Sequence, residues 1–297
     1  MQPNDTEIED LADFFHGWHL DVIQLAPRQN QTTVWRTASR SHRILQLQAG
    51  PAFALRGLVP SDCTCVFLSA SAHAAVRVIG QPLQTDDLVL ATTGARIDLF
   101  VPADAVLCVL IVESRQLREF GARHALRIWS GGNVDSEDAA ALLRYLREPQ
   151  QRFDIAALTV HIRQVLAKSK VISAAGTANT SRISAVLRAC RLLEKSFPEP
   201  MTLGELSRLC GVATRTLEYG FKQMYDTTPV AYIKGQRLTR SRMTLLNPRV
   251  QAPISATAQA HGFTHMGQYS SDYRRLFGES PSMTIMRGQT LRQSKQA

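Results

Sequence analysis

The sequence lacks any hydrophobic stretch of about 18 residues, the length needed to cross a membrane, although 44% of its 297 residues are hydrophobic. Residues 1–13 are acidic and lack the basic and then apolar pattern of a signal peptide. Cysteine is scarce: the five residues are scattered, and an odd number fits a reducing compartment better than a disulfide framework. We therefore expect a cytoplasmic protein with no membrane partner.

Clustered metal ligands are also missing. His16 and His19 have no third ligand nearby, and the His-x-His pair with a downstream Glu that metal-dependent cupins use is absent. Cys63 and Cys65 lie on one face of an expected strand, where thiols usually pack as small apolar groups. The sequence therefore predicts no catalytic residue, no metal site and no cofactor.

Positive charge is concentrated in the C-terminal part of the chain. Residues 179–297 hold 17 Lys and Arg against 7 Asp and Glu, a net +10, whereas residues 1–178 hold 17 against 18, a net −1. A concentrated basic region attracts phosphate. Charge alone leaves two interpretations open, a nucleic-acid-binding surface and an ordinary basic surface.

Short apolar runs separated by turn residues fill the N-terminal part. Strands of this length and spacing are typical of an all-β barrel or sandwich. We therefore predict an α+β protein whose residues 1–130 form a β-rich, cupin-like barrel or jelly roll with a sensing role. The predicted strands include residues 42–48, 63–68, 87–90, 96–101 and 105–112.

Two helices are expected next, over Ser136–Arg147 and Phe153–Lys170, because apolar residues recur there at helical spacing. This pair, within residues 131–172, offers a dimer surface, and packing against its own β domain is the open alternative. Residues 173–181 are small and polar and are expected to form a flexible linker.

The C-terminal third contains one supersecondary unit twice. Each copy has a helix, a turn at glycine, a second helix and a helix-starting proline; Gly211 and Gly262 are 51 residues apart, and Pro229 and Pro281 are 52 apart. This order is the pattern of a helix-turn-helix, whose second helix reads the DNA major groove. The two units are expected over residues 202–225 and 254–277.

Helix signals around the repeat are clear. Ile183–Lys195 is expected to be helical, and Thr202 followed by Glu205 predicts a capping box. Pro229–Leu246 is expected to form one 18-residue helix, about 27 Å long. Successive major-groove faces lie about 34 Å apart, so this connector suits two reading helices in adjacent grooves.

These residues resemble the AraC/XylS family of bacterial transcription regulators, over residues 183–288 within an expected domain at 182–289. The first unit carries the similarity through Gly211–Leu217, Phe221, Pro229, Tyr232–Ile233, Arg237–Leu238, Arg242 and Leu245–Leu246. The second carries it through Ile254, Ala258, Gly262–Phe263, Tyr269, Tyr273, Phe277–Gly278 and Ser280–Pro281. The chain departs from the family at Ala213, Thr257, Gly267 and Thr284–Ile285.

The resemblance implies that the first recognition helix reads bases through Arg215, Glu218 and Tyr219. Arg can grip a guanine edge with two hydrogen bonds, Glu can accept from cytosine, and Tyr can pack on a thymine methyl. Thr216 and Lys222 complete the expected DNA-contacting set on this helix. The alternative for all of them is a solvated polar face.

In the second recognition helix, the family's reading positions are matched by Met266, Gly267, Gln268 and Ser271, and Gln268 suits adenine. Met266 and Gly267 offer no specific hydrogen bond, so this helix is expected to recognise mainly phosphate and DNA shape. Further DNA contacts are expected from Thr264, His265, Arg274 and Arg275.

We interpret the chain as a sequence-specific DNA-binding transcription regulator. The family implies binding of double-stranded promoter DNA and activation through RNA polymerase, with a small-molecule effector and a homodimer as further candidates. Two other classes stay open: a DNA-tethered β-barrel enzyme, and an architectural DNA binder without ligand control.

Overall fold

The protein forms two compact units, residues 1–22 with 30–179, and residues 23–29 with 180–297. The structure is a computed structural model. It describes residues 4–15, 18–38, 42–71, 74–85, 87–117, 126–130, 160, 162–164, 166–167, 170–174, 181–196, 199, 201–247, 249 and 252–296.

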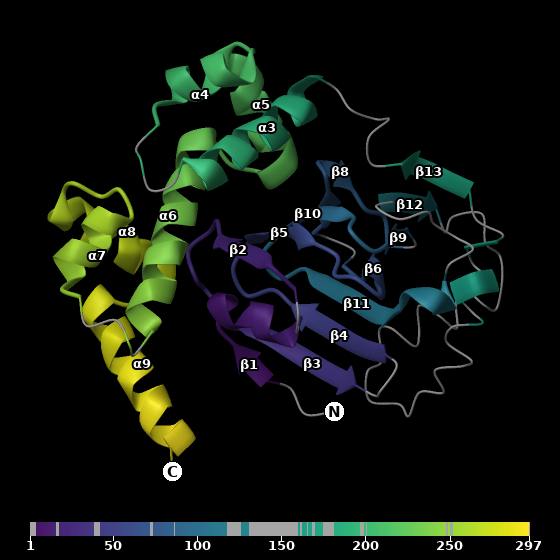
Figure 1. Cartoon of the computed structure of the whole chain (residues 1–297), viewed down its shortest axis with the longest axis horizontal. Coiled ribbons are helices and arrows are strands. Elements are labelled where there is room, and N and C mark those ends of the chain that lie inside the picture. The colour runs from purple at the N-terminus through teal and green to yellow at the C-terminus, as the bar shows by residue number, and fades with distance from the viewer. Residues whose placement is uncertain are drawn as a thin grey trace. The chain divides into compact units, whose positions relative to one another are not determined.

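The first unit is rich in β-structure. Its larger sheet has eight strands, among which β4, β11 and β6 lie side by side in antiparallel register (Figure 1). In spatial order the strands are β1 (Asn4–Thr6), β3 (Thr32–Ala38), β4 (His42–Gln48), β11 (Val106–Glu113), β6 (Cys63–Ser69), β9 (Leu88–Ala91), β12 (Leu126–Ser130) and β13 (Lys170–Ala174).

A second sheet has five strands: β2 (Leu20–Gln24), β5 (Phe53–Leu58), β10 (Arg96–Val101), β7 (Arg77–Val78) and β8 (Gln81–Pro82). Two short 3₁₀ helices are η1 (Ile8–Phe14) and η2 (Ser114–Gln116). The strands therefore form two sheets rather than one closed barrel, and the expected β-rich, cupin-like N-terminal fold is confirmed as a two-sheet arrangement.

Alternation along the strands explains why the two sheets pack together. In β11, Leu107, Val109 and Ile111 belong to a core shared with β5 and β10, whereas Cys108 and Leu110 contribute to a second core on the other face. Successive strand residues point to opposite faces. Strand β11 is therefore buried on both faces, which explains its long continuous apolar run.

The second core bears on the expected helical pair. Ile162 and Leu166 are 0% and 1% exposed and pack with residues of the large sheet. For these two residues the structure matches the alternative in which the segment packs against its own β domain. Ser136–Arg147 and most of Phe153–Lys170 lie outside the described residues.

Strand β13 corrects one boundary. Lys170 was expected to end a helix, and Ser173 to begin a linker, yet both lie in a strand that pairs antiparallel with β12. The prediction was wrong there because strand pairing depends on a partner about 40 residues away, which local helix and linker signals do not reveal.

The second unit is helical and also contains residues 23–29. The Gln24 side chain donates through Nε2 to the Leu276 carbonyl at 2.7 Å, and the Arg28 N–H donates to the same oxygen at 3.0 Å. The helices are α3 (Ser181–Lys195), α4 (Leu203–Cys210), α5 (Thr214–Tyr225), α6 (Pro229–Leu246), α7 (Ile254–Ala260), α8 (Met266–Phe277) and α9 (Pro281–Gln296). Among the described residues, no helix is both long and apolar enough for a membrane span.

Candidate nucleic-acid interface

The first helix-turn-helix consists of α4, a turn at Gly211 and α5. The predicted capping box is confirmed: Glu205 N–H donates to Thr202 Oγ1 at 3.2 Å, and Thr202 N–H donates to Glu205 Oε2 at 2.8 Å. Gly211 ends α4 with φ of +66°, a left-handed conformation that glycine adopts without steric cost. The turn between the two helices is therefore fixed by local sequence.

Helix α5 has one buried face and one exposed face. Leu217 and Phe221 are fully buried, and the Phe221 ring packs edge-on against Tyr232 of α6, with centroids 5.1 Å apart. Three predicted reading residues, Arg215, Glu218 and Tyr219, lie on the exposed side. The buried face anchors the helix, and the opposite face is free for a ligand.

Arg215 and Tyr219 form part of a small cluster. Arg215 Nε donates to the Tyr219 hydroxyl at 3.3 Å, and the Arg215 guanidinium lies 5.7 Å from the ring centroid. Arg182 of α3 lies 5.8 Å from the same ring. Arg182 was missed from sequence; the available signal was Gly220 in mid-helix, which permits α3 to approach α5 closely.

The other two predicted DNA-contacting residues of α5 differ from each other in exposure. Thr216 is half-buried, and Lys222 is exposed. Lys222 Nζ lies 2.9 Å from Asp226 Oδ1, across the C-terminal end of the helix. Exposed ion pairs of this kind contribute little to stability, so Lys222 can exchange this partner for a phosphate at low cost.

The second helix-turn-helix repeats this arrangement with α7 and α8. Tyr269 and Tyr273 are fully buried, whereas Phe263 is half-buried and packs against the same core. The predicted contact residues on this unit are exposed except Met266, which is half-buried. The exposed set comprises Thr264, His265, Gln268, Ser271, Arg274 and Arg275.

A carboxylate that sequence reasoning missed organises α8. Asp272 is 3% exposed, and its Oδ2 accepts from Gln268 Nε2 at 2.9 Å and lies 3.0 Å from Lys234 Nζ on α6. Arg275 pairs with its other oxygen. Burial raises the pKa of Asp272, but the hydrogen bonds from Gln268 and Lys234 and the nearby cations outweigh burial and leave that pKa lowered. Asp272 is therefore an ionised, buried acceptor.

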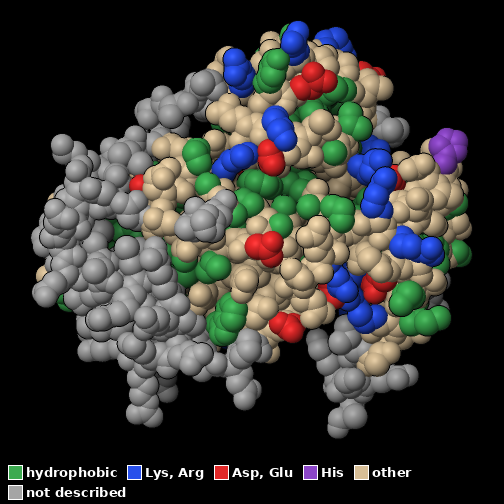
Figure 2. Space-filling view, turned by 180° about the vertical axis from the view of Figure 1, so that it is seen from behind, with side chains coloured by type: hydrophobic (Ala, Val, Ile, Leu, Met, Phe, Trp, Pro, Cys, Tyr) green, Lys and Arg blue, Asp and Glu red, His purple; other side chains and the backbone are tan. Residues whose placement is uncertain are grey.

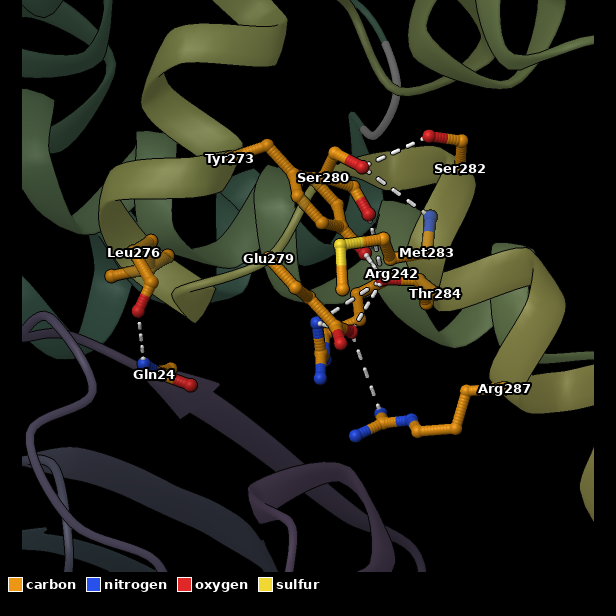
Figure 3. A network of polar contacts seen from close by, with 10 residues as sticks. All are labelled: Gln24, Arg242, Tyr273, Leu276, Glu279, Ser280, Ser282, Met283, Thr284 and Arg287. Carbon is orange, nitrogen blue, oxygen red and sulfur yellow. Dashed lines mark hydrogen bonds and ion pairs between the residues drawn. The ribbon is translucent and has the colours of Figure 1, made fainter.

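A second buried network fixes the start of α9 (Figure 3). Arg242, 1% exposed, donates through Nη1 to Glu279 Oε1 at 2.7 Å, and Thr284 Oγ1 donates to the same oxygen at 2.6 Å. Tyr273 Oη lies 2.9 Å from Thr284 Oγ1. Thr284, a departure from the family pattern, thus joins α6, α8 and α9 at one point.

Basic side chains, several of them beside an acidic side chain, recur over the part of the surface that the helical unit occupies (Figure 2). The described residues contain no group of three or more His, Cys, Asp and Glu side chains placed to hold a metal. Cys63 and Cys65 both contact the core between the sheets, and burial raises the pKa of each thiol. Raised thiol pKa values disfavour nucleophilic chemistry.

Known proteins share this helical unit. A family model described as "Helix-turn-helix domain" matches residues 206–287. A probable thc operon regulatory protein of Rhodococcus erythropolis is 35% identical over 92 residues, which cover 30% of this chain and 27% of that protein. XylDLEGF operon transcriptional activator 2 of Pseudomonas putida is 32% identical over 99 residues, which cover 33% of this chain and 63% of that protein. The chain thus spans less than two thirds of either relative.

One solved structure is similar in sequence over about a third of this chain. A probable AraC family transcriptional regulator from Rhodopseudomonas palustris is 30% identical, with 35% of this chain and 96% of that chain covered and a TM-score of 0.33. The family model's segment, residues 206–287, contains both helix-turn-helix motifs and the prolines that start α6 and α9. The chain belongs to the AraC/XylS family of transcription regulators.

Proposed function

We propose that this protein is a sequence-specific transcription regulator that binds double-stranded promoter DNA through α5 and α8. One observation carries the proposal: two recognition helices of the same length, 12 residues each, are anchored by buried aromatic faces and expose polar faces. Helix α6 connects the two helix-turn-helix motifs over 18 residues. Its length is about 27 Å, close to the ~34 Å between adjacent major-groove faces.

On α5 we assign base reading to Arg215, Glu218 and Tyr219. The contact between Arg215 and Tyr219 holds both side chains on the exposed face before DNA arrives, which reduces the entropy lost on binding. Thr216 and Lys222 are assigned to the phosphate backbone, where charge and hydroxyl donors add affinity without sequence information.

On α8 we assign base reading to Gln268, with Ser271 and Met266 close to the same groove. Thr264 and His265 precede the helix and Arg274 and Arg275 follow on its last turns, so they suit phosphate on either side. Met266 offers only apolar contact, which recognises shape or a thymine methyl.

Gel shifts with the full-length protein and its own promoter region test this assignment. Affinity should fall with salt at a log–log slope of about −0.9 per phosphate neutralised. Arg215→Ala should reduce the preference for promoter over random DNA, because a bidentate Arg–guanine contact contributes about 1–3 kcal/mol of discrimination. Arg274→Ala should weaken binding to all sequences equally.

Arg115→Ala provides the matched control, because Arg115 is an exposed arginine, 72% accessible, in the β-rich unit. It should leave DNA binding unchanged. Equal losses on promoter and random DNA for Arg215→Ala would remove that residue from the reading set, and no shift at low salt for the unaltered protein would refute the function.

The finer parts of the proposal concern regulation. Because a matching relative is named a transcriptional activator, we propose activation in the cytoplasm through contact with RNA polymerase, with the β-rich unit responding to a small-molecule effector or mediating homodimerisation. A reporter assay tests the sign of regulation. A thermal-shift screen against metabolites tests the effector, and sedimentation tests the dimer.

A further inference from the structure

Asp272 occupies an unusual place in the second recognition helix. It is 3% exposed, yet it lies one helical turn after the exposed Gln268 and accepts a hydrogen bond from its amide nitrogen at 2.9 Å. Lys234 of α6, 3.0 Å away, supplies a cation behind it. The carboxylate therefore sits between the buried side of α8 and a predicted base-reading side chain.

Comparison of the two repeats shows that helix packing does not require a carboxylate here. Asp272 is the seventh residue of α8, and the seventh residue of α5 is Gly220. A Cβ at Gly220 would lie 2.5 Å from Val186 Cγ2 of α3, so the first repeat has no room for a side chain. In the second repeat the position carries a charged group, whose burial is costly unless it is paired.

The hydrogen bond to Gln268 has a direct chemical consequence. An ionised carboxylate only accepts hydrogen bonds, so it favours the amide orientation that turns Nε2 toward Asp272. The flipped amide would place Oε1 against Oδ2, oxygen against oxygen. With one N–H engaged, Gln268 retains one N–H donor and the Oε1 acceptor, the pair that matches N7 and N6 of adenine.

We propose that Asp272 is a specificity-determining positioning residue, which locks the Gln268 amide in the orientation that reads adenine in preference to guanine. This inference rests on the proposed function, because it presumes that α8 enters the major groove. Guanine presents two acceptors, N7 and O6. An amide that was free to flip could offer two N–H donors outward and would accept guanine as well.

The test is selection of preferred sites from randomised DNA by the full-length protein and by Asp272→Asn. Asparagine is nearly isosteric with aspartate but can either accept from Gln268 Nε2 or donate to Oε1, so both amide orientations are satisfied. The unaltered protein should show one adenine position that Gln268→Ala abolishes. Asp272→Asn should convert it to a position that accepts adenine or guanine. One bidentate contact supplies a preference of ~5- to 150-fold, and we expect the preference for adenine over guanine to fall at least about fivefold.

Lys234→Gln separates positioning from stability. It removes one of the two ion pairs of Asp272 but leaves the Arg275 pair and the Gln268 hydrogen bond, so it should lower the melting temperature and keep the adenine preference. If Asp272→Asn alone does not fold, the double variant Lys234→Gln with Asp272→Asn removes both charges and should show the same change to adenine or guanine.

The outcomes distinguish this inference from the function beneath it. No preferred site for the unaltered protein would overturn both. Clear preferences at the positions read by α5, together with an adenine position that Asp272→Asn leaves unchanged, would overturn the role of Asp272 alone. The absence of any adenine position that depends on Gln268 would also overturn the role of Asp272 alone. In a Gln268→Ala background, Asp272→Asn should have no further effect on base preference.

Discussion

At the scale of single residues, one glycine of each proposed recognition helix is informative: Gly220 lies in the middle of α5, and Gly267 lies in the first turn of α8. A Cβ at Gly220 would meet Val186 Cγ2 at 2.5 Å and the Arg182 carbonyl oxygen at 3.1 Å, whereas a Cβ at Gly267 would meet nothing within 4 Å. Gly220 is required by close helix packing. Gly267 has no such packing partner among the described residues, although glycine within a helix is about 0.5–1 kcal/mol less stable than alanine.

We therefore predict that Gly267→Ala raises the free energy of unfolding of the helical unit by up to about 0.5–1 kcal/mol, the range for a helix interior, while Gly220→Ala, the control, lowers it. Urea denaturation followed by circular dichroism measures both. A loss of stability in Gly267→Ala would contradict this account. If stability rises but DNA affinity falls, Gly267 serves close approach of the backbone to DNA.

The sequence was informative about residues whose roles are local and uninformative about those whose roles depend on packing. Thr202 with Glu205 predicts a capping box and Pro229 predicts a helix start, both from neighbouring residues alone, and the structure confirms both. Asp272, by contrast, would be expected on the exposed side of an amphipathic helix. Its burial depends on Lys234, 38 residues earlier, and no periodicity reveals that contact.

At the scale of elements, the same distinction separates helices from strands. The predicted helix Pro229–Leu246 and the predicted strand His42–Gln48 are confirmed at both ends. The short strands β1, β7 and β8 were not predicted, since two or three residues carry no measurable alternation and owe their conformation to a neighbouring strand. The predicted boundary at β13 was wrong because that strand, too, depends on a neighbouring strand, β12.

Helix α9 depends on a titratable contact. Burial alone would raise the pKa of Glu279, but the hydrogen bond from Thr284 and the charges of Arg242 and Arg287 lower it. A carboxyl with a lowered pKa in the folded state stabilises the fold above its ordinary pKa, about 4.3, and that contribution is lost as pH falls through the folded value. Protonation of Glu279 would remove a carboxylate charge 2.7 Å from the buried Arg242 guanidinium.

We predict that the melting temperature of the helical unit falls as pH drops below about 4.3, and that Glu279→Gln shows a lower melting temperature at neutral pH with a weaker acid dependence in this range. Calorimetry from pH 7 to pH 3 measures both. Glu113→Gln in the β-rich unit is the control, because Glu113 pairs only with the exposed Arg115 among the contacts described. Parallel pH profiles for Glu279→Gln and the unaltered protein would exclude this contact as the cause.

At the scale of the whole molecule, the two helices that we propose to read DNA are unequal. Helix α5 exposes Arg215 and Glu218, whose side chains can each recognise a base through hydrogen bonds. Helix α8 begins with Met266 and Gly267, whose side chains cannot. We predict that mismatches in the half of the operator read by α5 cost about 1–3 kcal/mol each. The half read by α8 should tolerate substitution, apart from one adenine. Equal penalties across both halves in a base-by-base scan would contradict this assignment.

The hydrogen bond from Gln24 to the Leu276 carbonyl joins residues 252 positions apart, and this separation has a consequence for biosynthesis. At about 5–20 residues per second, Leu276 is added about 12–50 s after Gln24. Throughout that interval the segment of residues 23–29 lacks the Leu276 carbonyl, to which the Gln24 side chain and the Arg28 N–H donate in the finished protein. We expect a nascent chain stalled before α8 to be cleaved by proteases at this segment, and a released full-length chain to be protected there.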